Sequence, residues 1–359
     1  MFAFRDYHVR MYRFILFIFS LALAQTVSAQ ETYTLDEKTD AWILTDAPEP
    51  GSPEAQLAVA YKRLAEGEYQ EAMKLSSIWM TRHKRHPLMG EAHIIHGDAL
   101  FAQRYYYESL FDYEVVARDH YGTQAEIIAL ERELEIATLF AHGVKKLNFG
   151  MRISDATDEA EELLIRIQER LPLSPLAETA GLELADLYYR RKQMKLSNDM
   201  YQIFIENFPR SPELNKARAR RIYTRLATYR GPAFNAAGLD DARKELLQLQ
   251  YISPSLAETM NSNGLITRID ESLGQKMLHT ARWYLKTNNP IAAEYTIRRL
   301  LQLHEHTTAS IEALEHLLPQ ILPQLPPIVL NELGDFYDIY QELLLGKVIT
   351  ATKTLETNP

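Results

Sequence analysis

The chain has 359 residues, 46% of them hydrophobic and 24% charged, with a formal net charge of −9. This size and composition suit one large domain or two ordinary ones, and the acidic balance offers no basic face for nucleic acid. The sequence contains no cysteine, which excludes disulfides, thiol catalysis, cysteine-ligated zinc and attachment through a lipidated cysteine.

The N-terminus predicts an export signal over residues 1–29. Three arginines precede an apolar run that begins at Phe14, and Val27 and Ala29 occupy the −3 and −1 positions of a cleavage site. The run is too short for an uncleaved anchor, because a membrane-spanning helix needs about 20 apolar residues. Met1 or Met11 is the true start, since the segment after Met11 already forms a complete short signal peptide.

Residues 30–53 are rich in Thr, Asp and Glu and end in a run of prolines, so we expect an irregular leader. Trp42 and Ile43 are candidates to dock on the first helices. Helical periodicity begins at Glu54 and predicts a series of helix–turn–helix pairs. The pairs are expected at 54–87, 89–121, 123–172, 174–209, 211–254 and 255–303.

Two of the turns are enlarged, by residues 148–155 in the third pair and residues 230–238 in the fifth. The pattern fades after residue 306, where a C-terminal helical cap and tail is expected over 307–359. Within it we predict a capping helix over 308–318, an interruption by four prolines, and a final amphipathic helix over 328–349.

A spacing ladder recurs within these pairs. A small residue is followed by a large apolar one at +3, a small one at +12 and large ones at +16 and +19. The copies are Ala185, Tyr188, Ser197, Tyr201 and Phe204; Gly97, Leu100, Ser109, Tyr113 and Val116; and Ala281, Tyr284, Ala293, Ile297 and Leu300. Small residues let two helices approach closely, while the large ones share one helix face, so we expect the ladder tyrosines in the core.

The ladder resembles the tetratricopeptide repeat, a pair of antiparallel helices. The resemblance implies an all-α, tetratricopeptide-like α-solenoid of five to six antiparallel helix pairs with a C-terminal capping helix, the repeats occupying residues 54–306. The small residues that open the return helices lie farther apart than the repeat period of about 34 residues, so insertions and lengthened helices are expected.

Two stretches resemble a narrower family. The helix end Tyr201 to Pro212, with its Phe-Pro-Arg-Ser-Pro turn, is similar to that of the BamD (YfiO/ComL) family, the tetratricopeptide component of outer-membrane β-barrel assembly. Residues 265–300, with a double alanine at 292–293, resemble the C-terminal repeats of that family. The likeness covers residues 52–317. It departs at the N-terminus, where typical members carry a lipidated cysteine.

This resemblance implies a non-catalytic periplasmic scaffold that binds protein partners, namely an outer-membrane β-barrel assembly component or nascent outer-membrane proteins. Without a lipidated cysteine, its place at the inner face of the outer membrane would depend on those partners. One alternative is an envelope scaffold of another pathway, such as peptidoglycan or cell-division coordination. The other alternative is a metal-dependent enzyme.

The metal alternative rests on four histidines, His83, His86, His93 and His96, whose spacing can ligate zinc. No carboxylate is clearly placed to complete such a site. The sequence also lacks a nucleophile elbow, a phosphate-binding loop and a dinucleotide fingerprint. We therefore expect no catalytic residue, no metal site and no cofactor.

In the tetratricopeptide class, the first helix of each pair lines the concave face. The resemblance therefore points to a partner-binding groove, here called the predicted groove, formed by Asp98, Phe101, Tyr105, Asp186, Tyr189, Arg190, Arg282 and Lys286. Aromatic side chains among alternating charges suit the capture of an extended peptide or a partner helix. The alternative to partner binding is that each of these residues belongs to an ordinary solvated helix face.

Overall fold

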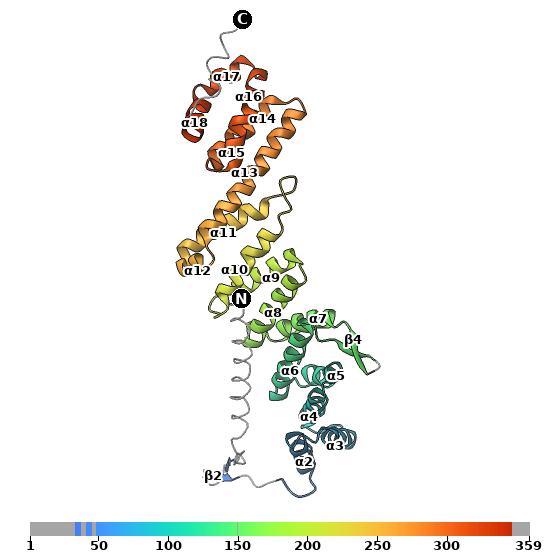
Figure 1. Ribbon diagram of the computed structural model, residues 1–359. Helices are drawn as coiled ribbons and strands as arrows, with labels where there is room; N and C mark the ends of the chain where they lie inside the picture. Colours follow the sequence, from blue (N-terminus) through green and yellow to red (C-terminus); the bar gives the residue numbers. More distant parts are fainter. Residues whose placement is uncertain (1–32, 37–40, 45–47, 149, 347–359) are drawn as a thin grey trace, which may run out of the picture. The chain divides into compact units, whose positions relative to one another are not determined.

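The structure, a computed structural model, describes residues 33–36, 41–44, 48–148 and 150–346 (Figure 1). The predicted export signal lies outside these residues. So does the chain end after residue 346, with the last residues of the predicted final helix. The chain divides between Arg104 and Tyr105 into two compact units.

In the part of the chain that the structure describes, the first unit contains a short antiparallel hairpin and three helices. They are β1 (Tyr33–Asp36), β2 (Ala41–Leu44), α2 (Pro53–Ala65), α3 (Tyr69–Arg82) and α4 (Met89–Ala102). The hairpin lies in the leader that we expected to be irregular; strands of four residues are too short to leave a readable alternation. Helix α2 begins after Ser52, whose Oγ accepts a hydrogen bond from the amide of Ala55 at 3.1 Å.

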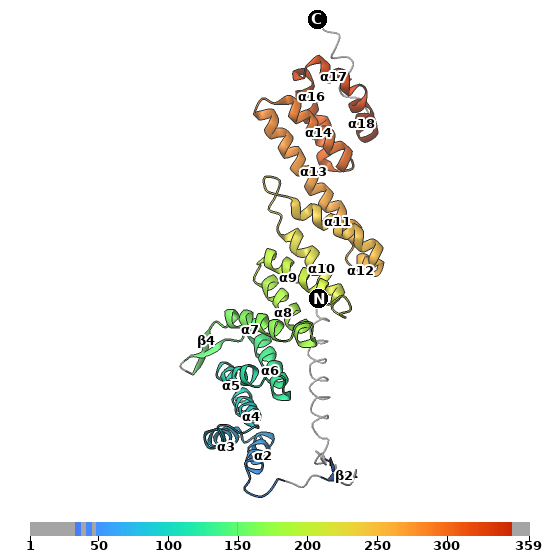
Figure 2. The ribbon, with the colours of Figure 1, turned by 180° about the vertical axis from the view of Figure 1, so that it is seen from behind.

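The second unit is a succession of helices in which chain neighbours pack together (Figures 1 and 2). Its first part comprises α5 (Tyr106–Asp119), α6 (Gln124–Ala141), β3 (Lys146–Asn148), β4 (Met151–Ser154), α7 (Thr157–Arg170), α8 (Pro175–Arg190) and α9 (Met194–Asn207). It continues with α10 (Leu214–Ala227), α11 (Ala237–Ile252), α12 (Pro254–Thr259), α13 (Ser262–Lys286) and α14 (Pro290–His304). The predicted all-α, tetratricopeptide-like class is confirmed.

Ladder residues form the contact between α8 and α9. Ala185 and Ser197 are fully buried where α8 and α9 meet, and Ser197 Oγ donates a hydrogen bond to the carbonyl of Ala185 at 3.0 Å. Tyr201 and Phe204 fill the core beside them, with 0% and 1% of their surface exposed. Tyr284 of the third ladder copy is half-buried against the C-terminal core.

The turns within five of the pairs share one backbone conformation, and the α10–α11 turn does not. The second residue after the first helix has a positive φ, at Gly67, Arg104, Gly143, Lys192 and Asn288. A left-handed residue there lets the next amide bond back to the helix end, as when the amide of Gln193 donates to the carbonyl of Tyr188 at 2.9 Å. This bond closes α8 and sends the chain into α9.

Helix α13 joins two cores. Ile269 and Leu273, in its first half, pack with α10, α11 and α12, whereas Leu278 and Ala281 pack with the C-terminal helices. The pair predicted over 255–303 begins with two helices, because Asn261, at φ 52°, separates α12 from α13. At Gly274 a Cβ would lie 2.9 Å from Thr307 Oγ1, so glycine permits the close approach of the next segment.

The C-terminal segment corrects two predictions. Helix continues past residue 318 through α15 (Thr308–Glu312), a π-helical turn (Ala313–Leu317), α16 (Leu318–Ile321) and a 3-10 turn (Leu322–Gln324). The wider π turn precedes Pro319 and accommodates it, since a proline cannot donate to an i−4 carbonyl.

The predicted final helix is instead two, α17 (Pro327–Leu333) and α18 (Phe336–Leu345), because Gly334 adopts φ 53° and ψ −124° between them. Tyr337 of α18 is fully buried, and its hydroxyl donates to Glu294 of α14 at 2.8 Å. This contact fixes α18 on α14. Within the described residues, no helix is both long and apolar enough to cross a membrane.

Phe204→Ala tests the ladder. We expect it to lower the free energy of unfolding by about 3–5 kcal/mol, because a fully buried aromatic ring is lost and a cavity remains. Ile203→Ala, next in sequence but 43% exposed, is the matched control and should cost less than about 1 kcal/mol. Urea unfolding followed by circular dichroism measures both, and equal losses would contradict the assignment.

Candidate functional site

The structure gives the residues of the predicted groove different environments. Asp98 and Phe101 are half-buried on α4, and Tyr105, immediately before α5, is 41% exposed. The cationic members of the set are exposed: Arg190, Arg282 and Lys286. Arg190 donates to Glu183 at 2.6 Å, and Arg282 pairs with Glu312, so both lie in surface ion pairs.

Asp186 is the exception, because it is 5% exposed and holds three helices together. It accepts a hydrogen bond from Tyr201 of α9, and Arg220 of α10 donates to it at 2.8 Å. The same guanidinium lies 5.4 Å from the ring centre of Tyr189, the one other groove residue in this cluster. Burial, reinforced by Asp186, raises the pKa of Tyr201 above its usual range. Asp186 therefore has a packing role.

A pocket of about 210 Å³ lies between α5, α6 and α7, and none of its lining residues belongs to the predicted groove. Its lining residues are Tyr107, Leu110, Phe111, Glu114, Glu133, Glu159, Glu162, Leu163 and Arg166. Tyr107 and Phe111, four residues apart on α5, share one helix face and meet edge to face with ring centres 5.5 Å apart. They are 37% and 63% exposed, which makes them an accessible aromatic edge.

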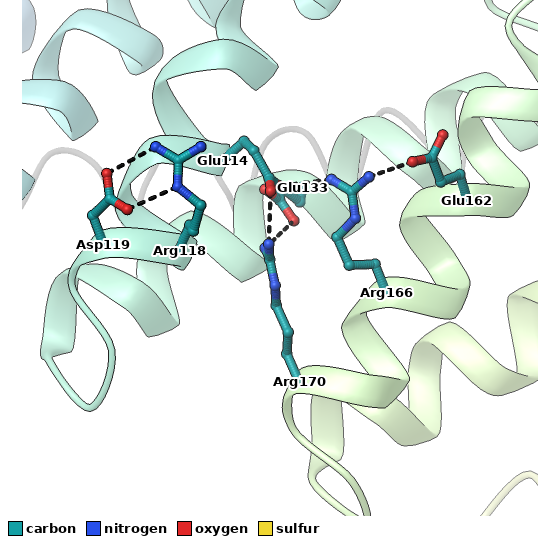
Figure 3. A network of polar contacts seen from close by, with 7 residues as sticks. All are labelled: Glu114, Arg118, Asp119, Glu133, Glu162, Arg166 and Arg170. Carbon is teal, nitrogen blue, oxygen red and sulfur yellow. Dashed lines mark hydrogen bonds and ion pairs between the residues drawn. The ribbon is translucent and has the colours of Figure 1, made fainter.

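Charged side chains of α5, α6 and α7 meet at the same pocket (Figure 3). Glu114 of α5 accepts hydrogen bonds from two residues of α7, Arg166 at 2.6 Å and Arg170 at 2.7 Å. Arg166 also pairs with Glu162, one turn earlier on α7. Although burial acts to raise the pKa of Glu114, the hydrogen bonds and charges of the two arginines lower it. This network holds α5 against α7.

Glu133 of α6 lies behind this network and is fully buried. Neither of its carboxylate oxygens has a hydrogen-bond partner, and its nearest described cation, Arg170, is 3.6 Å away in an ion pair without a hydrogen bond. Burial raises the pKa of Glu133 to about 7. The positive charge of Arg170 acts against this rise, and the nearby Glu114 contributes to it. Glu133 is thus a buried carboxyl group that changes charge near neutral pH.

The hairpin β3–β4 flanks the pocket. The enlarged turn predicted at 148–155 folds as two antiparallel strands, which extend to one side of α6 and α7 in Figure 1. Lys146 of β3 pairs with Glu159 of α7, and its ammonium lies 5.1 Å from the ring centre of Tyr107. Met151 and Ile153 of β4 are more than half exposed. The hairpin therefore contributes a cation to the aromatic edge and exposed apolar side chains beside it.

The histidines that motivated the metal alternative lie in the first unit. His83 and His86 pack on Trp79, with ring centres 5.0 and 5.2 Å away, and His86 Nε2 lies 3.1 Å from Glu54. His93 and His96 are half-buried on α4. Among the residues that the structure describes, no group of three or more His, Asp or Glu side chains could hold a metal ion.

The sequence was compared with known proteins. The family model for YfiO, described as an outer membrane lipoprotein, matches residues 132–321, slightly more than half of the chain. The match runs from within α6 to the end of α16, and so includes Glu133 and the α7 wall of the pocket. No curated protein matches the chain.

The raised pKa of Glu133 predicts a pH-dependent stability. An ordinary pKa of 4.5 in the unfolded chain and about 7 in the folded one means that the native state binds the proton more tightly. The stability linked to Glu133 is therefore fully present below pH about 4.5, and it is lost as pH rises through about 7, by on the order of 3 kcal/mol.

Glu133→Gln removes this contribution, so the variant should lose less thermal stability than the native protein between pH 5 and pH 8. Glu135→Gln, on an exposed position of the same helix, is the control and should behave like the native protein. Melting temperatures across this pH range test the effect. Parallel curves for the native protein and Glu133→Gln would refute it.

Proposed function

Since the chain belongs to the YfiO family of outer membrane lipoproteins, we propose that it is a non-catalytic periplasmic scaffold of outer-membrane β-barrel assembly. In this role it binds a β-barrel assembly component or nascent outer-membrane proteins. The observation that carries the proposal is the family match, which coincides with the helix pairs from α6 onward. The packing of those pairs explains why such a chain suits binding.

The helix pairs supply rigid elements that present side chains for contact. Exposed aromatic residues are the best anchors for a polypeptide, because they bury a large area at little cost in conformational entropy. Within the matched region, Trp283 and Tyr295 are 55% and 54% exposed on α13 and α14. Trp283 directly follows the exposed Arg282 in the chain, and Tyr295 lies on the return helix of the same pair, which supports this end of the predicted groove as one partner surface.

In this proposal the protein is held at the membrane in a different way from the lipoproteins that the family description names. Its members are lipoproteins, whereas this sequence contains no cysteine to carry a lipid. We therefore assign membrane association to protein partners. Charged residues at the rim of such an interface mainly set the rate and orientation of association, while buried aromatic residues supply most of the free energy.

Affinity capture tests the function. The tagged protein, recovered from detergent-solubilised envelopes of cells that express it, should bring down a β-barrel protein with polypeptide-transport domains, identified by mass spectrometry. An unrelated tagged periplasmic helical protein is the control. Recovery of peptidoglycan enzymes alone would contradict the proposal and favour an envelope scaffold of another pathway.

The double variant Arg282→Glu and Lys286→Glu tests the predicted groove in the same experiment. Reversing two exposed charges should reduce recovery of the barrel protein several-fold, because like charges then meet at the interface. Lys244→Glu, at an exposed position of α11, is the matched control. Unchanged recovery with the double variant would place the partner surface elsewhere.

A further inference from the structure

We propose that the pocket between α5, α6 and α7 is a socket for a lysine or arginine side chain of a bound polypeptide. This inference rests on the proposed function, because it specifies what one part of the scaffold recognises in its partner. The pocket, called the socket below, holds about 210 Å³. Sites for small molecules usually hold about 300–1,000 Å³, so the socket fits one side chain better than a free metabolite.

The aromatic edge gives the socket affinity for a cation. An ammonium or guanidinium group within about 6 Å of a ring centre is attracted by the electrons of the ring face. The protein already uses this attraction, since Lys146 lies 5.1 Å from the centre of Tyr107 and pairs with Glu159. Phe111, with 63% of its surface exposed, offers a second ring on the same edge.

Among the described residues, the socket has one glutamate to which no cation donates a hydrogen bond. Four glutamates line it: Glu114, Glu133, Glu159 and Glu162. Among the described cations, Arg166 lines the socket, and Arg170 and Lys146 approach from its sides. Arg118 also lies near Glu114, but its guanidinium pairs with Asp119. Each of the other glutamates has a charged hydrogen-bond partner, whereas both oxygens of Glu133 lack one. An additional positive charge would therefore be stabilised there.

The apolar part of the lining suits the stem of a long basic side chain. Leu110 of α5 and Leu163 of α7 provide surface for methylene groups, which lysine and arginine bury while the charged end seeks acidic groups. A purely aliphatic side chain would make the same apolar contacts and would leave Glu133 uncompensated. The lining therefore discriminates in favour of a basic residue.

Binding of a cation should also release a proton. The charged groups that face Glu133 are Glu114 of α5, Arg166 and Arg170 of α7 and, across the socket, Glu159 and Glu162 of α7 with Lys146 of β3. An added positive charge favours the ionised form of Glu133. With a pKa of about 7 in the free protein, binding at pH 7 should release up to about half a proton.

The test compares three extended nine-residue peptides of alternating threonine and valine, whose central residue is lysine, norleucine or glutamate. Isothermal titration calorimetry of the full chain measures their affinities. We expect the lysine peptide to bind about tenfold more tightly than the norleucine peptide, a difference of about 1.4 kcal/mol. The glutamate peptide should bind most weakly. Titrations in two buffers of different ionisation enthalpy measure the released proton.

Two variants, each with a matched control, test whether the lysine preference comes from the socket. Glu133→Gln keeps the shape and removes the charge, so the lysine preference should fall below about threefold and the proton release should disappear. Glu135→Gln should retain both. Phe111→Ala should weaken binding of the lysine peptide several-fold, whereas Tyr251→Ala, which removes a ring that is 94% exposed on α11, should not.

Equal affinity for the lysine and norleucine peptides would overturn the socket. Absence of binding by either peptide, or a full lysine preference in Glu133→Gln, would overturn it too. The proposed scaffold function and the proposed socket can be contradicted independently of each other. Recovery of the barrel protein without a lysine preference leaves the scaffold function and removes the socket. A lysine preference without that recovery leaves the socket and removes the role in β-barrel assembly.

Discussion

The close approach of two helices at a pair of small residues is the constraint on which the rest of the structure depends. Ala185 and Ser197 bring α8 and α9 near enough for a side chain to bond the backbone of the other helix at 3.0 Å. Only that approach lets Tyr201 reach Asp186, which Arg220 of the next helix also contacts. The α8–α9 pair is thereby tied to α10, as stacked repeats require, because every repeat buries its face against a neighbour.

The sequence predicted the features that depend on this close approach of paired helices. The ladder located Tyr188 and Tyr201 in the core and the helix pairs α8–α9 and α13–α14, because its small and large positions recur at fixed spacing. It missed the hairpin β3–β4, whose strands of three and four residues are too short to show an alternation. It also placed an interruption where the π turn before Pro319 lets the helical segment continue. The interruption was predicted from the proline alone, but the surrounding core decides how the backbone adapts to it.

The pocket was missed for a related reason. Glu133 belongs to a run of charged residues in α6, and such a run is typical of a helix surface exposed to solvent. Only the packing of α5 and α7 over that face buries the carboxyl group, and no local pattern reports such long-range packing. Arg166 of α7 serves both purposes, since it joins two helices through Glu114 and lines the pocket. A site made from structural ion pairs is preorganised, which favours recognition of a polypeptide side chain.

Site-specific photo-crosslinking in cells tests the central claim, that this surface binds envelope polypeptides, most directly. A photoreactive phenylalanine analogue replaces Phe111 at the pocket in one strain and Tyr251 of α11, which is 94% exposed, in another. The account predicts adducts with outer-membrane proteins or their assembly components from position 111 and none of these from position 251. Absence of adducts at position 111, or the same adducts from both positions, would contradict it.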